Sequence, residues 1–271
     1  MSELALVMHG GGMRGAYGAG AIESLTRLLA PGNFDVVLGT SAGAANAAGM
    51  AAGGGMVLRE IWTHQLDLSH FIHPFRPRWI TDTDYLIHIC EAQGITNASI
   101  RNAPLRILLA VTHYHTGATH YFSNQDDVLS VMHASVSMPV LCRTPIFING
   151  EPYLDGGITA STTDLIKRAL AEGATRVVAL DLSSPVQWFS RIGLQWYARN
   201  KRGGLRAAIM KMIDAPYPEP VDTCDGRVYL IRPLHLAVSR ITRAPFDLTR
   251  AYEMGVRETI EDEKLRQFLN K

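Results

Sequence analysis

Residues 39–43 read Gly-Thr-Ser-Ala-Gly and match the pattern Gly-x-Ser-x-Gly, in which a serine can act as a nucleophile. A largely apolar stretch, 34–38, precedes this pattern and an alanine-rich stretch, 42–52, follows it, so it falls between a predicted strand and a predicted helix. A sharp turn between such elements exposes the serine hydroxyl beside the positive end of the helix. Five small residues can also form nothing more than a tight turn, but this context favours Ser41 as a nucleophile.

A second cluster of glycines lies nearer the start of the chain. Residues 9–15 read His-Gly-Gly-Gly-Met-Arg-Gly, between a predicted strand at 4–8 and a predicted helix at 15–29. Consecutive glycines let backbone N–H groups point into a shared space, where they can bind an anion. In an acyl hydrolase, a loop of this kind stabilises the oxyanion of the reaction intermediate.

Two other known motifs compete for this loop. Gly10, Gly12 and Gly15 match the dinucleotide fingerprint Gly-x-Gly-x-x-Gly, which needs an acidic residue at the end of the second strand. Asp35 instead opens that strand, so a nucleotide-binding oxidoreductase is retained only as an alternative. The motif of α/β-hydrolase lipases, His-Gly-Gly-Gly, normally lies much further upstream of the serine than Gly12 lies from Ser41.

An aspartate followed by two glycines occurs at residues 155–157, directly after a predicted hairpin at 146–154. At the end of a strand, the Asp155 carboxylate can turn toward the edge of a neighbouring strand. On the residues alone, a local turn made by an Asp-Gly pair is the favoured interpretation. A role for Asp155 as a catalytic base remains the alternative at this point.

Together, these blocks resemble those of patatin-like phospholipases. The shared features are Gly-Gly-Gly-x-Arg-Gly after the first strand, Gly-x-Ser-x-Gly after the second, and Asp-Gly-Gly downstream. The resemblance is closest to bacterial members. It extends over roughly residues 4–182, including 134–139 and 155–182, and more loosely to 252–255. Three blocks in the same order are far more specific than any one of them.

The resemblance implies a serine acyl hydrolase that cleaves carboxylic ester bonds of lipids. It implies Ser41 as nucleophile, Asp155 as base, and an oxyanion loop made of residues 10–13 (Gly10, Gly11, Gly12 and Met13). The implied substrates are lipids or other acyl esters, and the chemistry requires neither a cofactor nor a metal. Two departures affect the expected pocket: His9 replaces a small or acidic residue, and 161–163 (Ser-Thr-Thr) replaces a stretch that often contains proline.

The elements that must position these groups follow an alternating pattern. The sequence predicts strands at 4–8, 34–38, 105–112, 119–122, 176–182 and 227–231, a hairpin at 146–154, and helices at 15–29, 42–52, 56–66, 84–92, 164–171 and 246–269. Such alternation is typical of α/β folds with a mainly parallel sheet. We therefore expect a three-layer α/β/α patatin-like fold, with residues 1–271 as a single domain.

The overall composition narrows the class of protein. A net charge of +1 argues against a dedicated nucleic-acid-binding protein. Cys90, Cys142 and Cys224 are widely spaced and are interpreted as reduced thiols. The first residues lack the basic region of a secretory signal, and the uncharged stretch 36–58 is too rich in small polar residues for a membrane span. These features predict a cytoplasmic protein, with peripheral contact to a membrane as the alternative.

The segment 186–213 is expected to be a peripheral helical element. It carries six basic residues, no acidic residue and several aromatic ones, among them Trp188 and Trp196. The favoured interpretation is a solvated helix that packs on the domain through its aromatic face. The alternative is an amphipathic segment at a membrane interface, and a catalytically silent lipid-binding protein also remains open.

Three closely spaced histidines could form a metal site. His113 and His115 are two positions apart, and His120 follows closely. No cysteine or glutamate lies at a suitable spacing to complete a typical zinc site. A metal at this cluster is therefore not expected.

Overall fold

The fold was analysed in a computed structural model, which describes residues 4–29, 34–66, 68–73, 79–142, 145–201, 203–223, 226–233 and 235–271. Residues 74–78, Arg202 and Cys224 are among those that lie outside these ranges. Within them, one sheet contains β1 (Leu4–His9), β2 (Val36–Gly39), β3 (Arg106–His113), β4 (Thr119–Ser123), β5 (Ile146–Ile148), β6 (Glu151–Asp155), β7 (Arg176–Asp181) and β8 (Val228–Ile231). The strand order is β5-β6-β3-β2-β1-β7-β8, with β4 paired to β3.

The centre of this sheet is parallel, as predicted. β1 pairs in parallel with β2 and β7, and further parallel pairs join β2 to β3 and β7 to β8. The strands β4, β5 and β6 add antiparallel pairs at one side. The predicted hairpin turn is present, because Asn149 and Gly150 both have positive φ angles, of 52° and 83°.

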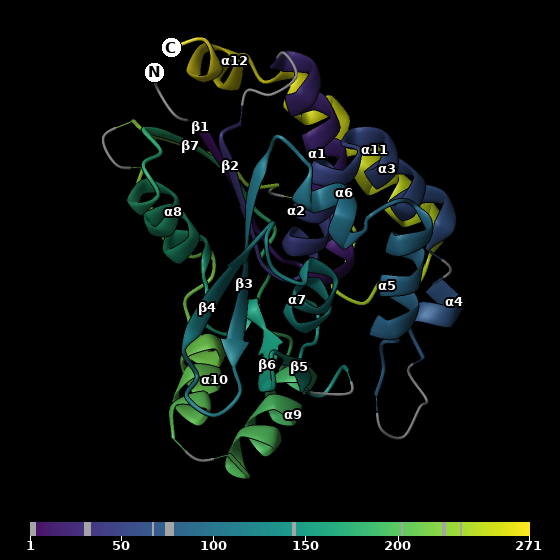
Figure 1. The fold of residues 1–271 in the computed structure, drawn as a ribbon, viewed down its shortest axis with the longest axis vertical. Coiled ribbons are helices and arrows are strands. Elements are labelled where there is room, and N and C mark those ends of the chain that lie inside the picture. Colours follow the sequence, from purple (N-terminus) through teal and green to yellow (C-terminus); the bar gives the residue numbers. More distant parts are fainter. Residues whose placement is uncertain are drawn as a thin grey trace.

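Helices cover both faces of the sheet (Figure 1). They are α1 (Gly15–Leu28), α2 (Ala42–Ala52), α3 (Gly55–Glu60), α4 (Leu68–Phe71), α5 (Thr83–Ala92), α6 (Asn97–Arg101), α7 (Val128–Ser135), α8 (Thr162–Ala171), α9 (Trp188–Arg199), α10 (Gly204–Asp214), α11 (Pro245–Glu261) and α12 (Glu263–Leu269). Short 3-10 turns occupy Gly12–Arg14 and Gly156–Ile158, and a π-helical turn occupies Ile61–Gln65. None of the helices in the described part of the chain has the length and apolar character needed to cross a membrane.

The side chains of β1 show how the three layers form. Leu6 and Met8 point into the larger core, beneath α1, α2 and α11, whereas Ala5 and Val7 point into a smaller core beneath α8. Because side chains alternate along a strand, a run that is apolar at every position is buried on both faces. This arrangement confirms the expected α/β/α fold.

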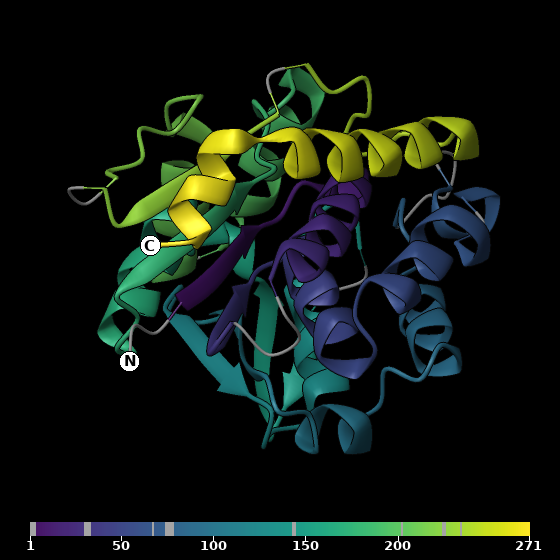
Figure 2. The same ribbon diagram turned by 90° about the horizontal axis from the view of Figure 1, so that it is seen from above.

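The packing of α11 on α1 determines where the last part of the chain lies. Figure 2 shows α11 passing over α1, and a Cβ atom on either Gly20 or Gly255 would overlap the backbone of the other helix. The hydroxyl of Tyr17 also donates to Glu258 at 2.8 Å. Since α1 begins directly after the glycine loop, this contact brings the segment before α11 close to that loop.

The register on β3 brings two strand ends together. Leu108 pairs with both β2 and β4, and Val111 pairs with both β4 and β6. Because a strand residue has one neighbour on each edge, β2 and β6 must share the same edge of β3. Gly39 lies opposite Leu109 and Asp155 lies opposite Val111, so the carboxyl ends of β2 and β6 meet.

Several helices were not predicted. α4, α6 and α7 lie in stretches without a predicted helix, although Thr96 and Asp127 cap α6 and α7 by accepting from the N–H groups of Ser99 and Ser130. The segment 186–213, expected to be a peripheral helical element, forms two helices, α9 and α10. The expected packing through the aromatic face is wrong for α9, because Trp188 and Trp196 are 74% and 65% exposed. Leu194 is buried instead.

Candidate active site

Ser41 lies at the turn between β2 and α2, as predicted. Its φ and ψ angles are 56° and −130°, an unusual conformation for a residue with a side chain. Small neighbours make this turn possible, because a Cβ on Gly39 would overlap the Gly43 carbonyl and a Cβ on Gly43 would overlap the Met8 carbonyl. The serine is therefore held at the carboxyl edge of the sheet in a strained turn.

Asp155 meets Ser41 directly. The Ser41 Oγ donates to the Asp155 Oδ2 at 2.8 Å, with no histidine between the two side chains. Asp155 is 1% exposed, and its Oδ1 accepts from the Gly157 N–H at 2.7 Å. The Asp-Gly turn that the sequence favoured is thus present as well, because the same carboxylate makes both contacts.

The environment of Asp155 makes its carboxylate more basic than usual. Burial raises the pKa of this group from 3.8 to about 7, because the charged form loses its hydration. The hydrogen bonds from Gly157 and Ser41 and the positive charge of Arg240 oppose this rise in pKa. A carboxylate with a pKa near neutrality can accept a proton and also return it at physiological pH.

A buried serine fixes the backbone of the turn. The Ser135 Oγ accepts from the Ser41 N–H at 3.0 Å and donates to the Ala110 carbonyl at 2.7 Å. Ser135 is completely buried at the end of α7. The sequence indicated the surrounding stretch only through its resemblance to the family, and no motif identified this positioning role.

The glycine loop lies between Ser41 and a distant backbone segment. A Cβ on Gly10 would overlap Ser41, and one on Gly11 would overlap the carbonyl of Leu182, just after β7. Gly12 has a φ of 58°, and a Cβ there would overlap the carbonyl of Arg240. Three glycines are needed because the loop is confined on both sides.

Arg240 also contacts the residue that follows these glycines. Its carbonyl accepts from the Met13 N–H at 3.2 Å, so this N–H is engaged within the protein. Its guanidinium donates to the Ser184 Oγ at 2.8 Å and to the Ser184 carbonyl at 2.6 Å. Burial lowers the pKa of Arg240, while the negative charge of Asp155 raises it. Sequence reasoning did not identify Arg240, because an isolated arginine in a loop has no recognisable pattern.

The candidate site opens into a cavity of about 1220 Å³. This volume exceeds the ~300–1,000 Å³ that is usual for small-ligand pockets. Ser41, Asp155 and the glycine loop form its polar part, and His9 also lines it, as the sequence suggested. Most of one wall is apolar and consists of Leu58, Ile61, Trp62, Leu66, Phe71, Leu86, Cys90, Leu141 and Cys142. Ala207, Ala208 and Met212 of α10 also line the cavity.

The departure from the family pattern at 161–163 is also part of this cavity. Ser161 and Thr163 line it, and the Ser161 hydroxyl caps α8 by accepting from the Asp164 N–H at 3.2 Å. The capping bond explains why α8 begins at residue 162 without a proline.

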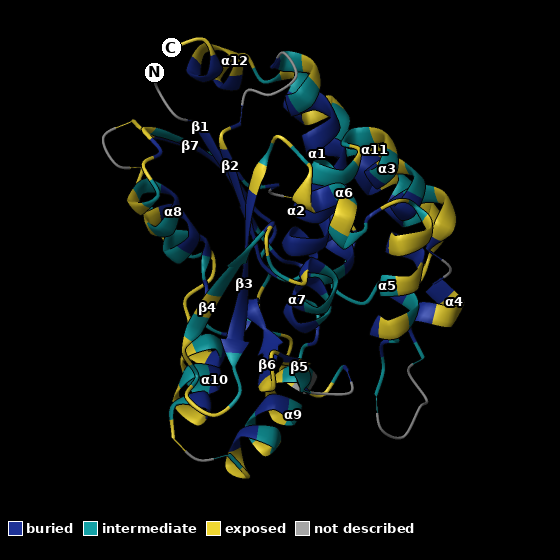
Figure 3. Cartoon of the chain, viewed as in Figure 1, coloured by how far each residue is buried: buried dark blue, intermediate teal, exposed yellow. Residues whose placement is uncertain are grey.

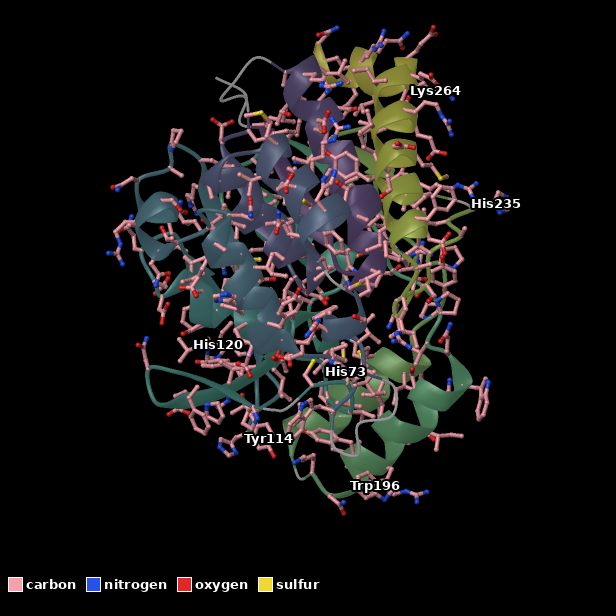
Figure 4. The ribbon with its side chains drawn as sticks, turned by 90° about the vertical axis from the view of Figure 1, so that its right-hand side faces the viewer. His73, Tyr114, His120, Trp196, His235 and Lys264 are labelled. Carbon is pink, nitrogen blue, oxygen red and sulfur yellow. The ribbon has the colours of Figure 1, made fainter. Side chains whose placement is uncertain are left out.

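Apart from His9, none of the described histidines lines this cavity. His235, which alone follows Asp155 in the chain, is exposed beside α11 and points away from the molecule (Figure 4). His113 stacks on His120 and contacts Thr116 and Glu151, while His120 contacts the hydroxyl of Tyr153. Across the described ranges, no three His, Cys, Asp or Glu side chains are grouped so that they could hold a metal ion.

The position of Asp35 argues against dinucleotide binding. Its carboxylate accepts from the Leu4 N–H at 2.8 Å, at the amino end of the sheet. The carboxyl end of β2, where a ribose-binding acid is required, carries Ser41. The loop and the acidic residue therefore lie at opposite ends of the strands.

Comparisons with known proteins identify the family of this chain. The family model for patatin-like phospholipases matches residues 6–165. An uncharacterized Escherichia coli protein, YjjU, is 28% identical over 217 residues, which cover 74% of this chain and 57% of YjjU. The crystal structure of VipD from Legionella pneumophila superposes with a TM-score of 0.51 at 14% identity, covering 100% of this chain and 67% of VipD. The chain belongs to the patatin-like phospholipase family, whose members are lipid acyl hydrolases.

Proposed function

We propose that this protein hydrolyses carboxylic ester bonds of lipids through a dyad of Ser41 and Asp155. The observation that carries the proposal is the direct 2.8 Å hydrogen bond between the two side chains, which line a large and mostly apolar cavity. A serine hydroxyl is a poor nucleophile unless a base accepts its proton. Asp155, with its pKa raised to about 7, is the base in contact with it.

The proposed reaction has two halves. Ser41 Oγ attacks the ester carbonyl carbon while Asp155 takes its proton, and the carbonyl oxygen becomes an oxyanion. The oxyanion is stabilised by N–H groups of Gly10, Gly11 and Gly12, with each donor contributing roughly 10²–10³ in rate. Met13, the fourth residue of the predicted loop, is left out because its N–H already donates to the Arg240 carbonyl. Collapse of this intermediate breaks the bond to the alcohol, which leaves with the proton from Asp155.

Water completes the cycle in the second half. Asp155 takes a proton from a water molecule as the oxygen attacks the acyl group on Ser41. The carboxylic acid leaves as the proton returns to the Ser41 oxygen. The apolar wall of the cavity suits an acyl chain, so lysophospholipids, phospholipids and acylglycerols are the proposed substrates.

The C-terminal part of the chain completes this proposed unit. The family match ends at residue 165, yet β7, β8 and Arg240 complete the sheet and confine the glycine loop. We therefore propose that residues 1–271 act as one domain. The composition of the sequence supports a cytoplasmic location.

A fluorophosphonate probe tests the proposed function. The native protein should be labelled at a single serine and should hydrolyse acyl esters from a panel of chain lengths and head groups. Ser41→Ala should show neither reaction. Labelling that persists in Ser41→Ala, or a native protein that is inert to the probe and to every ester, would reject the proposal.

A further inference from the structure

The outer face of α9 is unusually apolar for a protein surface. Trp188, Ile192 and Trp196 are 74%, 58% and 65% exposed, whereas Leu194 and Ala198 on the same helix are buried against α10. Large apolar side chains that gather on an exposed helix face commonly mark a site of interaction. Figure 3 shows exposed residues along α9, and Figure 4 shows Trp196 directed away from the body of the molecule.

These side chains form one narrow stripe. At 3.6 residues per turn, Trp188, Ile192, Trp196 and Arg199 fall within an arc of about 80°. Val140 lies beside the stripe, because it contacts Gly193, and is 37% exposed. We call these five residues the α9 face.

Basic residues predominate in the sequence that contains the α9 face. The sequence from 186 to 213 contains six basic residues and no acidic one. Arg191 is paired with Asp214, and Lys201 lies over the rings of Tyr114 and Tyr197. Arg199 on the face itself and Arg206 on α10 are exposed. An apolar stripe with cationic flanks matches the chemistry of a lipid surface that carries negative head groups.

The position of α9 next to the cavity fits the same partner. α10 packs on the inner side of α9, and its residues Ala207, Ala208 and Met212 line the cavity that contains Ser41. Val186, two residues before α9, lines the cavity as well. A membrane that contacts the α9 face would therefore lie next to a wall of the proposed acyl-binding site.

We propose that the α9 face docks this protein on anionic lipid membranes. Trp188, Ile192 and Trp196 insert at the head-group level, and Arg199 and Arg206 attract the negative surface. A second copy of the chain fits this face less well, because a symmetric contact would bring the cations of both copies together. Delivery of membrane lipids to Ser41 rests on the proposed function, whereas docking does not.

Vesicle flotation with the full-length protein measures docking directly. Ser41→Ala serves as the background, so that hydrolysis cannot alter the vesicles. The protein should bind vesicles of phosphatidylcholine mixed with phosphatidylglycerol and should bind pure phosphatidylcholine much more weakly. Raising the salt from ~0.1 M to ~1 M shortens the screening length from about 10 Å to about 3 Å, so binding should weaken.

Two pairs of variants separate the contributions of the face. Trp188→Ala with Trp196→Ala should reduce vesicle binding by at least about tenfold, because both interfacial anchors are lost. Phe246→Ala is the matched control, since Phe246 is 69% exposed but lies on α11, and it should bind normally. Arg199→Gln with Arg206→Gln should remove the preference for anionic vesicles, whereas Arg257→Gln on α11 should not.

The outcomes distinguish docking from catalysis. If the tryptophan variant retains its activity on a short water-soluble ester and loses activity on vesicle lipids, docking and delivery are both supported. Binding to anionic vesicles by a protein without esterase activity supports docking and rejects the proposed function. Unchanged vesicle binding by the tryptophan variant overturns docking. So does a native dimer that the same variant converts to monomers, since the face would then join two copies.

Discussion

The two parts of the chain divided near residue 165 contribute to the site in different ways. The first part carries the groups proposed to react, Ser41, Asp155 and the glycine loop, and it is the part that the family model matches. The second part confines that loop through the carbonyl groups of Leu182 and Arg240. Reacting groups need particular side chains, whereas a carbonyl is present in every residue. The second contribution therefore leaves almost no signature in the sequence.

The largest expected effect comes from the reacting serine. Ser41→Ala should lower kcat/KM by at least about 10⁴-fold, because the nucleophile is removed. The unfolding midpoint in urea should change little, since alanine fits the same turn. Near-native hydrolysis by this variant would show that the motif in the first part does not supply the nucleophile.

Asp155→Asn should have the next largest effect, a loss of about 10³- to 10⁵-fold, because an amide cannot accept the serine proton. In the native protein, kcat/KM should rise as pH increases through about 7, where Asp155 becomes deprotonated. A rate that does not depend on pH between 5 and 9 would contradict this role for Asp155.

The same shift in pKa affects folding. The pKa of Asp155 is about 7 in the folded state and 3.8 for the unperturbed group, so the folded state binds more protons between these values. Its contribution to the free energy of unfolding is therefore present at low pH and declines as pH rises from about 4 to about 7. Urea unfolding at pH 5 and pH 8 should show this decline in the native protein and a smaller one in Asp155→Asn.

Gly12→Ala tests how tightly the second part confines the loop. The new Cβ would overlap the Arg240 carbonyl, and the displaced loop should lower kcat/KM by about 10²- to 10³-fold. Gly94→Ala is the matched control, because Gly94 also has a positive φ, of 85°, but no atom lies within 4 Å of a Cβ there. Equal effects of the two variants on kcat/KM would mean that confinement by Arg240 is unimportant.

Arg240→Gln should have a smaller effect, which depends on pH. Removing the charge that lowers the pKa of Asp155 should move the rise in kcat/KM to higher pH. The rate at pH 7 should fall by less than about tenfold, with recovery at alkaline pH. The neighbouring exposed Arg243→Gln is the control. A uniform loss at every pH would assign Arg240 a purely structural role.

His235→Ala should have the smallest effect. His235 is exposed beside α11, so its removal should leave kcat/KM within about twofold of native. A loss as severe as that of Ser41→Ala would show that a histidine completes a triad and would reject the dyad.

The sequence was sufficient to predict elements with strong local signals. The turn at Ser41 follows from small residues between a strand and a helix, and the hairpin follows from Asn149-Gly150. α7 was not predicted, because its apolar residues show no clear helical spacing and its only capping signal is a single residue, Asp127. Ser135 and Arg240 act across 94 and 228 residues of chain on Ser41 and Gly12, and such contacts leave no local pattern.

The orientation of α9 could not be predicted for a different reason. Two of its faces carry apolar residues, Leu194 and Ala198 on one and Trp188, Ile192 and Trp196 on the other. Periodicity indicates that a helix is amphipathic but does not tell which apolar face meets the domain. The aliphatic face is buried because α10 offers matching aliphatic side chains, among them Ile209.

Two thiols in the cavity wall offer a way to observe occupancy without following turnover. Cys90 and Cys142 are free and buried, and burial raises the pKa of each to about 12. At pH 7, roughly one thiol in 10⁵ is then ionised, so alkylating reagents should modify them very slowly. An acyl chain in the cavity should slow the reaction further. The rate of alkylation would therefore report whether the cavity is filled, even in a protein that lacks Ser41.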